Sequence, residues 1–235
     1  MEAFILAGGK GTRLRSLVND RPKPMADIGG KPFLEHLLTH YKKKEITHFI
    51  LSTGYKKEII KNYFGSNFNG IPVSYAEENN PLGTGGAVLS AKAYLKTDNP
   101  FLILNGDTFF NIPISTFSNF HHSSKSKLSM ALMRASEGNR FGGVTLNREN
   151  KVISPSSFKA KKDDLANGGV YMLDQSIIKS FPNVKIPFSL EKSLLPGLLS
   201  KNISIYGIDL TSKFIDIGVP KDYLWCQKNY KEIFL

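Results

Sequence analysis

A glycine-rich segment near the start of the chain has the residue types and spacing of a phosphate-binding loop. Gly8, Gly9 and Gly11 directly follow a short apolar run. Glycine permits left-handed backbone angles and lets a phosphate approach main-chain N–H groups closely. Arg13 adds a forked cation suited to phosphate oxygens. The alternative is a simple turn, but the arginine favours a nucleotide phosphate site that comprises Leu6, Ala7, Gly8, Gly9, Gly11 and Thr12.

The spacing of these glycines excludes two other phosphate-binding motifs. A dinucleotide fingerprint needs a third glycine where Leu14 stands, and an acidic residue after the second strand. Residues 51–55, which close the second strand-like run, include no acid. A mononucleotide P-loop ends in Gly-Lys-Ser/Thr, and this segment lacks that ending. The segment therefore belongs to a different kind of phosphate loop.

Three charged residues elsewhere could act on the same phosphates. Lys23 lies between two prolines, which disfavour helix and hold the backbone extended around it. Asp107 follows the apolar run 101–104, and Asp216 closes another strand-like run. Two carboxylates from distant loops, together with phosphate oxygens and water, suit an octahedral Mg²⁺ site. Each of these residues taken alone could instead be a surface, turn or cap residue.

The elements that would position these residues alternate regularly in the first half of the chain. Strand-like runs are expected at 3–7, 48–51, 72–76 and 101–104, and helices at 33–44, 56–64 and 84–95. This order predicts an α/β fold of Rossmann-like type, with a mostly parallel sheet flanked by helices. Ligands in such sheets bind beyond the carboxyl ends of the strands, where the glycine-rich segment and Asp107 would lie.

The second half is less regular and predicts a smaller, antiparallel region that would bind an acceptor. The expected strands are 127–134, 142–146, 152–154, 168–173 and 203–209, and the expected helices are 174–181, 190–200 and 220–231. No linker, repeat or low-complexity tract divides the chain. We therefore expect a single domain over 1–235, with a nucleotide-binding part at about 1–110 and an acceptor-binding part at about 111–235.

Composition limits the location and the partners. The net charge of +11 favours anions, but the lysines and arginines are scattered and lack an aromatic platform for stacking bases. Nucleic-acid binding would rest on charge alone and is not expected. The single cysteine, Cys226, fits a reducing cytoplasm and excludes a thiolate metal cluster. No apolar run approaches the roughly 20 residues that span a bilayer, so no membrane association is expected.

Six short motifs occur in an order that resembles the sugar-1-phosphate nucleotidyltransferases along nearly the whole chain. Gly8–Leu14 with Pro22-Lys23-Pro24 is the most specific of them. The others are Pro81–Gly86, Asn105–Asp107, Phe141–Val144, Asn167–Tyr171 and Asp216–Gly218. The resemblance implies the nucleotide-diphospho-sugar transferase fold. It also implies a reaction in which a nucleoside triphosphate and a sugar 1-phosphate give a nucleotide sugar and pyrophosphate.

The resemblance also implies roles for individual residues. Arg13 would hold the departing pyrophosphate, Lys23 the transferring phosphate, and Asp107 and Asp216 a Mg²⁺ ion. Further nucleotide-binding residues would be Gly83, Thr84, Asn105 and Gly106, and the sugar phosphate would contact Gly142, Lys161, Asn167, Gly168 and Glu191. The family commonly has Glu-Lys-Pro where this chain reads Ala160-Lys161-Lys162, so Lys159 or Lys162 could take the place of Lys161.

The choice of base and sugar depends on smaller features. Relatives that make deoxythymidine-linked glucose carry a glutamine where this chain has Gly86, so its absence favours a larger base and GTP, although some uridylyltransferases also have a small residue there. The motifs are most similar to those of family members that guanylylate D-glycero-D-manno-heptose 1-phosphate for surface polysaccharides. Transfer of guanylyl to mannose 1-phosphate, transfer of uridylyl to an amino-sugar 1-phosphate, and a non-catalytic nucleotide-sensing role remain alternatives. Assembly as a homodimer is left open.

Overall fold

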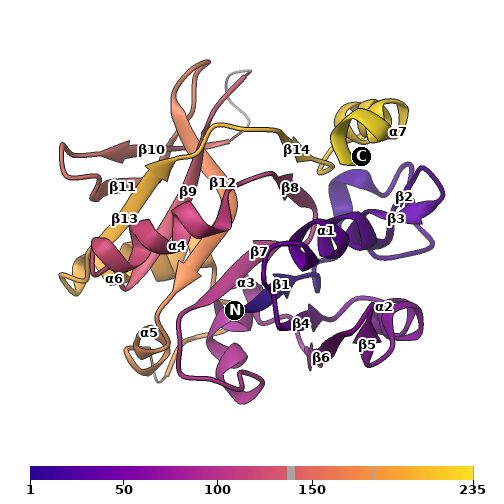
Figure 1. Cartoon of the computed structure of the whole chain (residues 1–235), viewed down its shortest axis with the longest axis horizontal. Coiled ribbons are helices and arrows are strands. Elements are labelled where there is room, and N and C mark those ends of the chain that lie inside the picture. Colours follow the sequence, from indigo (N-terminus) through magenta and orange to yellow (C-terminus); the bar gives the residue numbers. More distant parts are fainter. Residues whose placement is uncertain (137–140, 182, 235) are drawn as a thin grey trace.

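The central part of the chain is a parallel sheet, in a computed structural model that describes residues 1–136, 141–181 and 183–234. Strand β1 (Glu2–Leu6) lies between β4 (His48–Thr53) and β7 (Phe101–Asn105) and is parallel to both. Beyond β4 follow β6 (Ile71–Glu77), which is parallel, and the short antiparallel β5 (Asn67–Phe68). The predicted parallel sheet is confirmed (Figure 1).

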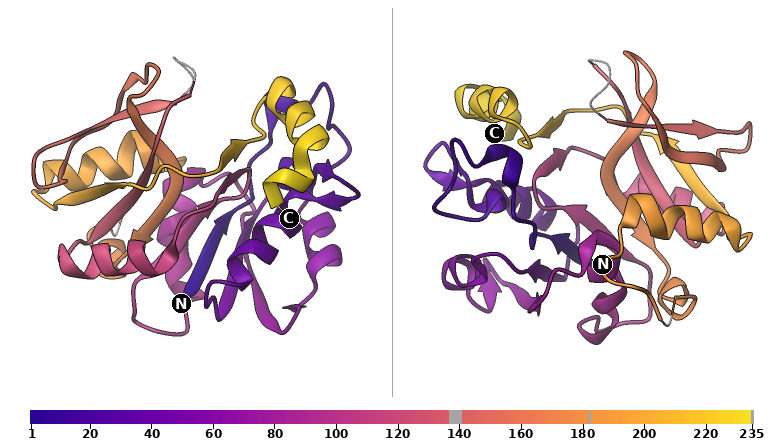
Figure 2. Two further views of the ribbon diagram at one scale, coloured as in Figure 1. Left: turned by 45° about the horizontal axis from the view of Figure 1, so that its top comes forward. Right: turned by 180° about the vertical axis from the view of Figure 1, so that it is seen from behind.

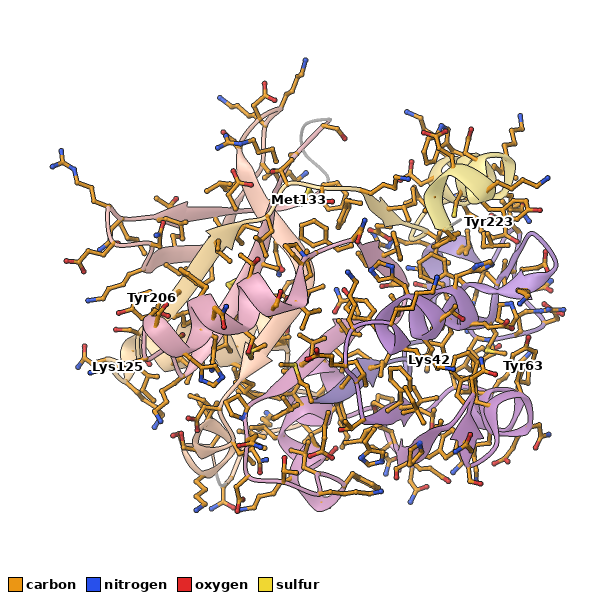
Figure 3. The ribbon with its side chains drawn as sticks, viewed as in Figure 1. Lys42, Tyr63, Lys125, Met133, Tyr206 and Tyr223 are labelled. Carbon is orange, nitrogen blue, oxygen red and sulfur yellow. The ribbon has the colours of Figure 1, made fainter. Side chains whose placement is uncertain are left out.

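The second half of the chain continues the same sheet instead of forming a separate one. Strand β12 (Leu165–Leu173) is antiparallel to β7 and connects the two halves. It also pairs with β9 (Leu128–Arg134) and β10 (Gly142–Leu146). The outer strands are β11 (Val152–Lys159), which pairs with β10, and β13 (Ile205–Asp209), which is parallel to β9. In Figure 3, Lys42 lies in the first half of the chain and Met133 in the second.

Helices cover the sheet and create two apolar cores. The first core contains side chains of α1 (Phe33–Lys42), α2 (Lys57–Phe64), α4 (Ile114–Ser123) and α7 (Pro220–Phe234). The second contains side chains of α3 (Gly83–Ser90), α5 (Ser176–Lys179) and α6 (Leu195–Ser200). The apolar face predicted for 33–44, formed by Phe33, Leu37, Leu38 and Tyr41, is buried.

Two small sheets and the last helix close the fold around the carboxyl ends of the central strands. Strand β14 (Phe214–Asp216) pairs with β8 (Thr108–Phe110), and β2 (Asp27–Ile28) pairs with β3 (Lys31–Pro32). Helix α7 is last in sequence but lies beside β2 near the start of the chain (Figure 2). There the Tyr223 hydroxyl donates to the Asp27 carbonyl (3.0 Å). In the described ranges, no helix is long and apolar enough to cross a membrane.

The buried face of α1 also contains a histidine that should make stability depend on pH. His40 lies edge-on against Phe109, and its Nε2 is buried without a hydrogen-bond partner among the described residues. Burial, together with Lys44 and Lys43, lowers the pKa of His40 to about 4. In the unfolded chain the same group takes up its proton near pH 6.5. The folded state is therefore most stable above about pH 6.5 and loses stability as the pH falls toward 4.

We expect replacement of His40 by leucine to remove part of this acid sensitivity. The urea midpoint of the parent chain should fall between pH 7.5 and 5, and that of His40→Leu should fall less, because one protonation of the unfolded state is gone. The exposed His122, changed in the same way, is the matched control. Parallel pH curves for His40→Leu and the parent would contradict the prediction.

Candidate active site

Two adjoining cavities lie where the central parallel strands end. The larger has a volume of about 680 Å³ and is lined by residues at strand ends, in loops and in helices. They are Leu6, Gly8, Gly9, Lys10, Ser52, Gly54, Tyr55, Glu78, Asn79, Pro81, Gly83, Thr84, Ala87, Asn105, Asp107 and Glu191. The smaller, of about 220 Å³, is lined by Leu6, Ala7, Gly9, Gly11, Thr12, Arg13, Lys23, Pro24 and Asp107. Their position agrees with the expectation for ligand sites in parallel sheets.

The glycine-rich segment turns between the two cavities. Gly11 has φ of +58°, in the left-handed region that glycine adopts without strain, and residues Thr12–Leu14 then form a single 3₁₀ turn. A Cβ at Gly11 would lie 2.8 Å from the Cβ of Lys23, so the loop packs directly on the stem of that lysine. Gly9 borders both cavities, and a Cβ there would have no neighbour within 4 Å. The segment thus presents an open backbone surface and the Arg13 side chain to the smaller cavity.

Lys23 and Asp107 line the smaller cavity, and Asp216, the other predicted metal-binding aspartate, lies beside Lys23 outside that lining. The Lys23 side chain is only 8% exposed, and its ammonium forms an ion pair with Asp107. Asp216 is brought close by β14, whose Asp216 pairs in register with Thr108. A side chain at Gly218 would lie 2.6 Å from Asp216 Oδ1 and 3.2 Å from Lys23 Nζ, so both charged groups border the glycine. One cation and two carboxylates therefore lie close together next to the smaller cavity.

This arrangement fits Mg²⁺ bound jointly by protein and substrate. Among the described residues, no group of three or more His, Cys, Asp or Glu side chains could form a complete metal cage. Mg²⁺ commonly uses only one or two carboxylates and takes its other ligands from phosphates and water. Asp107 and Asp216 supply that number of carboxylates, next to the smaller cavity.

The loop before α3 and the first turn of α3 form one wall of the larger cavity. Gly83 and Thr84 line it, and the N–H groups of Gly85 and Gly86 donate to the Phe188 carbonyl (2.8 and 3.0 Å). Gly86 itself does not line either cavity, and the first side-chain atom there would meet Leu82 at 3.0 Å. Packing of α3 against Leu82 therefore explains the glycine at position 86. Room for a larger base has to be explained by other residues.

A hydrogen-bonded network joins the predicted acceptor residues to this wall. Asn167 Nδ2 donates to the hydroxyl of the buried Tyr171 (2.5 Å), and that hydroxyl donates to Glu191 Oε1 (3.4 Å). The hydroxyl of Thr84 donates to Glu191 Oε2 (3.3 Å). Burial, followed by the charge of Glu191, raises the pKa of Tyr171 well above its usual value. The network fixes Glu191 at the edge of the larger cavity, between the two halves of the sheet.

The remaining predicted residues lie outside the two cavities. Gly106 N–H donates to the Leu6 carbonyl (3.0 Å) and so supports the cavity floor from behind. Gly168 packs against the Phe110 ring, and Gly142 begins β10. Lys161 is exposed in a turn, where its N–H donates to Asp164 (2.8 Å). Of the acceptor residues, the structure thus brings only Glu191 to the cavity wall.

Sequence reasoning missed one functional candidate, Glu78. Its Oε1 accepts from the Ser52 hydroxyl (2.8 Å) and its Oε2 accepts from the Leu82 N–H (3.0 Å). It lies against Gly8, where a Cβ would be 2.8 Å from Oε1. The sequence position of Glu78 could have indicated it, because Glu78 directly follows β6 and ligands bind beyond the carboxyl ends of parallel strands. The dinucleotide fingerprint places its acid after the preceding strand, β4, and therefore does not point to Glu78.

The chain belongs to the nucleotidyl transferase family, since the family model described as "Nucleotidyl transferase" matches residues 2–233. The resemblance stated from the motifs is confirmed. The fold of the family, a mostly parallel mixed sheet flanked by helices, is the fold described above.

Particular relatives narrow the comparison. A protein of Campylobacter jejuni described as "D-glycero-alpha-D-manno-heptose 1-phosphate guanylyltransferase" is 41% identical over 223 residues, which are 95% of this chain and 97% of the relative. A protein of Aneurinibacillus thermoaerophilus with the same description is 41% identical, with 97% of both chains covered. The crystal structure of HddC from Yersinia pseudotuberculosis matches with a TM-score of 0.83 and 33% identity over 97% of this chain and 99% of that one. HddC has also been crystallised in complex with GMP-PN.

Proposed function

We propose that this protein transfers the guanylyl group of GTP to a heptose 1-phosphate, of the D-glycero-D-manno kind, and releases pyrophosphate. Two relatives that share 41% of the sequence over nearly the whole chain are described as enzymes of this activity. The observation in this chain that carries the guanine assignment is the Glu78 carboxylate in the larger cavity. The nucleotide would be bound mainly by residues of about 1–110 and the acceptor by residues of about 111–235.

The chemistry of Glu78 favours guanine over the other bases. A carboxylate only accepts hydrogen bonds. Guanine presents two adjacent donors, the ring N1–H and the 2-amino group, whereas uracil and thymine present one N–H flanked by two carbonyls. Adenine and cytosine present a ring nitrogen that accepts. Because Ser52 and Leu82 hold the carboxylate in place, a base without two donors would leave it poorly paired.

The other residues of the site would bind and neutralise the reacting phosphates. The attacking sugar phosphate is already an anion, so the reaction needs no general base and depends on positioning and charge. Arg13 and the loop N–H groups would hold the pyrophosphate, and Lys23 the transferring phosphate. Asp107 and Asp216 would hold Mg²⁺, which when bound draws charge from the phosphoryl oxygens. Glu191 and Asn167, held by Tyr171, would accept and donate hydrogen bonds to sugar hydroxyls, with Gly142, Gly168 and one of Lys159, Lys161 or Lys162 nearby.

Pyrophosphate release across a matrix of nucleotides and sugar 1-phosphates tests the whole assignment. GTP with heptose 1-phosphate should be the most active pair in the presence of Mg²⁺. Higher activity with mannose 1-phosphate and GTP, or with an amino-sugar 1-phosphate and UTP, would support the alternative acceptors. No activity with any pair would favour a nucleotide-sensing subunit. We also predict a cytoplasmic location and assembly as a homodimer. Analytical ultracentrifugation can test the homodimer.

The Glu78 assignment has its own test, substitution by glutamine. We expect Glu78→Gln to lower kcat/KM with GTP about 10- to 100-fold, since a charged acceptor for two donors is replaced by a neutral amide. The ratio of UTP to GTP use should rise at the same time. Glu77→Gln is the matched control, because Glu77 pairs with Lys57 and Lys61 away from the cavities. An unchanged base preference in Glu78→Gln would remove Glu78 from base selection.

A further inference from the structure

The segment 188–191, from the second half of the chain, lies directly against the entry of helix α3. The Phe188 N–H donates to the Leu82 carbonyl (2.8 Å). A Cβ at Gly83 would lie 2.6 Å from the Phe188 carbonyl oxygen, and a Cβ at Gly85 would lie 2.9 Å from the Phe188 ring. These two glycines therefore allow the two segments to approach closely, so both halves of the chain build this wall of the larger cavity.

The side chain of Thr84 bonds across this contact in both directions. Its hydroxyl accepts from the Leu190 N–H (2.9 Å) and donates to Glu191 Oε2 (3.3 Å). A hydroxyl has a single proton to donate, and here that proton is used on Glu191. Thr84 belongs to the loop that the resemblance connects with the nucleotide, but its hydroxyl is bonded to the segment that carries the acceptor carboxylate.

The carboxylate of Glu191 is held more firmly at one oxygen than at the other. Oε2 accepts from Thr84 and also from the Ser189 hydroxyl (3.3 Å), which itself accepts from the Lys192 N–H (3.1 Å). Among the described residues, Oε1 accepts only from the Tyr171 hydroxyl, at the long distance of 3.4 Å. Each carboxylate oxygen offers about two lone pairs. Oε2 is therefore filled, and Oε1 has room for another donor.

We propose that Thr84 is a positioning residue for the acceptor, whose hydroxyl orients Glu191 so that Oε1 accepts from one hydroxyl of the sugar. This inference rests on the proposed transfer to a sugar 1-phosphate. The same loop also fixes Glu78, through the Leu82 N–H (3.0 Å), so one loop presents one carboxylate to the base and another to the sugar. Loss of the Thr84 hydroxyl should therefore weaken acceptor binding and leave nucleotide binding unchanged.

Substitution of Thr84 by valine removes the hydroxyl and keeps the branched shape. We expect Thr84→Val to raise the KM for heptose 1-phosphate about 5- to 20-fold at saturating GTP, because Glu191 is no longer held, and to leave the KM for GTP within about two-fold. Thr84→Ser keeps the hydroxyl and should restore parent-like constants. Thr97→Val is the matched control, since the Thr97 hydroxyl also donates to a glutamate, Glu2 Oε2 (3.1 Å), at the start of β1.

Two kinetic outcomes would overturn the proposal. The first is a higher KM for GTP with an unchanged KM for the sugar phosphate, which would return Thr84 to the nucleotide. The second is an equal loss in Thr84→Ser and Thr84→Val, since the hydroxyl would then not be the cause. If the substrate matrix gives a different active acceptor, the two KM values are measured with that acceptor and the same outcomes decide.

Two further measurements distinguish failure of this inference from failure of guanylyl transfer. Amide exchange at Leu190 should be faster in Thr84→Val and parent-like in Thr84→Ser, whatever reaction the protein catalyses, because the Leu190 N–H donates to the Thr84 hydroxyl. Unchanged exchange would overturn the positioning role even with guanylyl transfer confirmed. If no substrate pair is turned over, equilibrium dialysis of labelled heptose 1-phosphate replaces the kinetics. Weaker retention by Thr84→Val than by the parent would support the proposal, and equal retention would overturn it.

Discussion

Replacing Lys23 by methionine is expected to lower kcat about 10²- to 10³-fold while the chain remains folded. The ammonium of Lys23 is the buried cation at the smaller cavity, and it forms an ion pair with Asp107. Loss of one preorganised donor to developing charge typically costs ~2.7–4 kcal/mol of transition-state stabilisation. Methionine retains the apolar stem that packs against Gly11, so only the charge and its hydrogen bonds are removed.

Steady-state kinetics of pyrophosphate release, together with the thermal unfolding midpoint, separate the catalytic loss from a folding defect. Asp107 is 33% exposed and can be hydrated when its partner is lost, so the midpoint should change little. Lys127→Met is the matched control, because Lys127 pairs with Asp174 (2.9 Å) far from the cavities. Turnover of Lys23→Met close to that of Lys127→Met would show that Lys23 does not act on the phosphates.

The phosphate half of the site could be predicted from sequence because local signals determine it. Alternating strands and helices imply a parallel sheet, and a parallel sheet places the loops after β1 and β7 at one edge. Gly11 and Asp107 therefore reach the same cavity as expected. The proximity of Asp216 depends on the pairing of β14 with β8, which are far apart in sequence. Only the resemblance to a family, and no local pattern, could indicate that contact.

The acceptor half could be predicted less well for the same physical reason. Its strands pair across long sequence separations, and register determines which side chains face the site. A register shift between Asn167 and Val170 in the pairing of β12 with β9 changes which residues face each side of the sheet. No sequence motif indicates this shift. Lys161 illustrates the consequence, since it matched a motif but lies in an exposed turn. Glu191 lies in a π-helical turn over Leu190–Leu194, capped by Ser189, whereas the sequence predicts a regular helix over 190–200.

Asp216→Asn is expected to raise the Mg²⁺ concentration for half-maximal activity at least about ten-fold and to lower kcat about 10²-fold. Asparagine keeps the Oδ1 atom that accepts from the Gly218 N–H (2.6 Å), so the turn between β14 and α7 should persist. What is lost is one of the two negative charges that would bind the ion next to Lys23. A neutral amide oxygen is a weaker ligand for a hard divalent cation than a carboxylate is.

The control for this prediction has to reproduce the local geometry without the metal centre. Asp174 does so, because its Oδ1 accepts from the N–H of Ser176, also two residues further along (2.8 Å), at the start of α5. Mg²⁺ titrations of initial rate should therefore shift for Asp216→Asn and stay unchanged for Asp174→Asn. If the two variants gave the same Mg²⁺ curve, Asp216 would serve only to hold the turn at Gly218, and Asp107 alone would remain as a carboxylate ligand. If the curve shifted and kcat also recovered at high Mg²⁺, the charge of Asp216 would contribute to binding the ion and not to the chemical step.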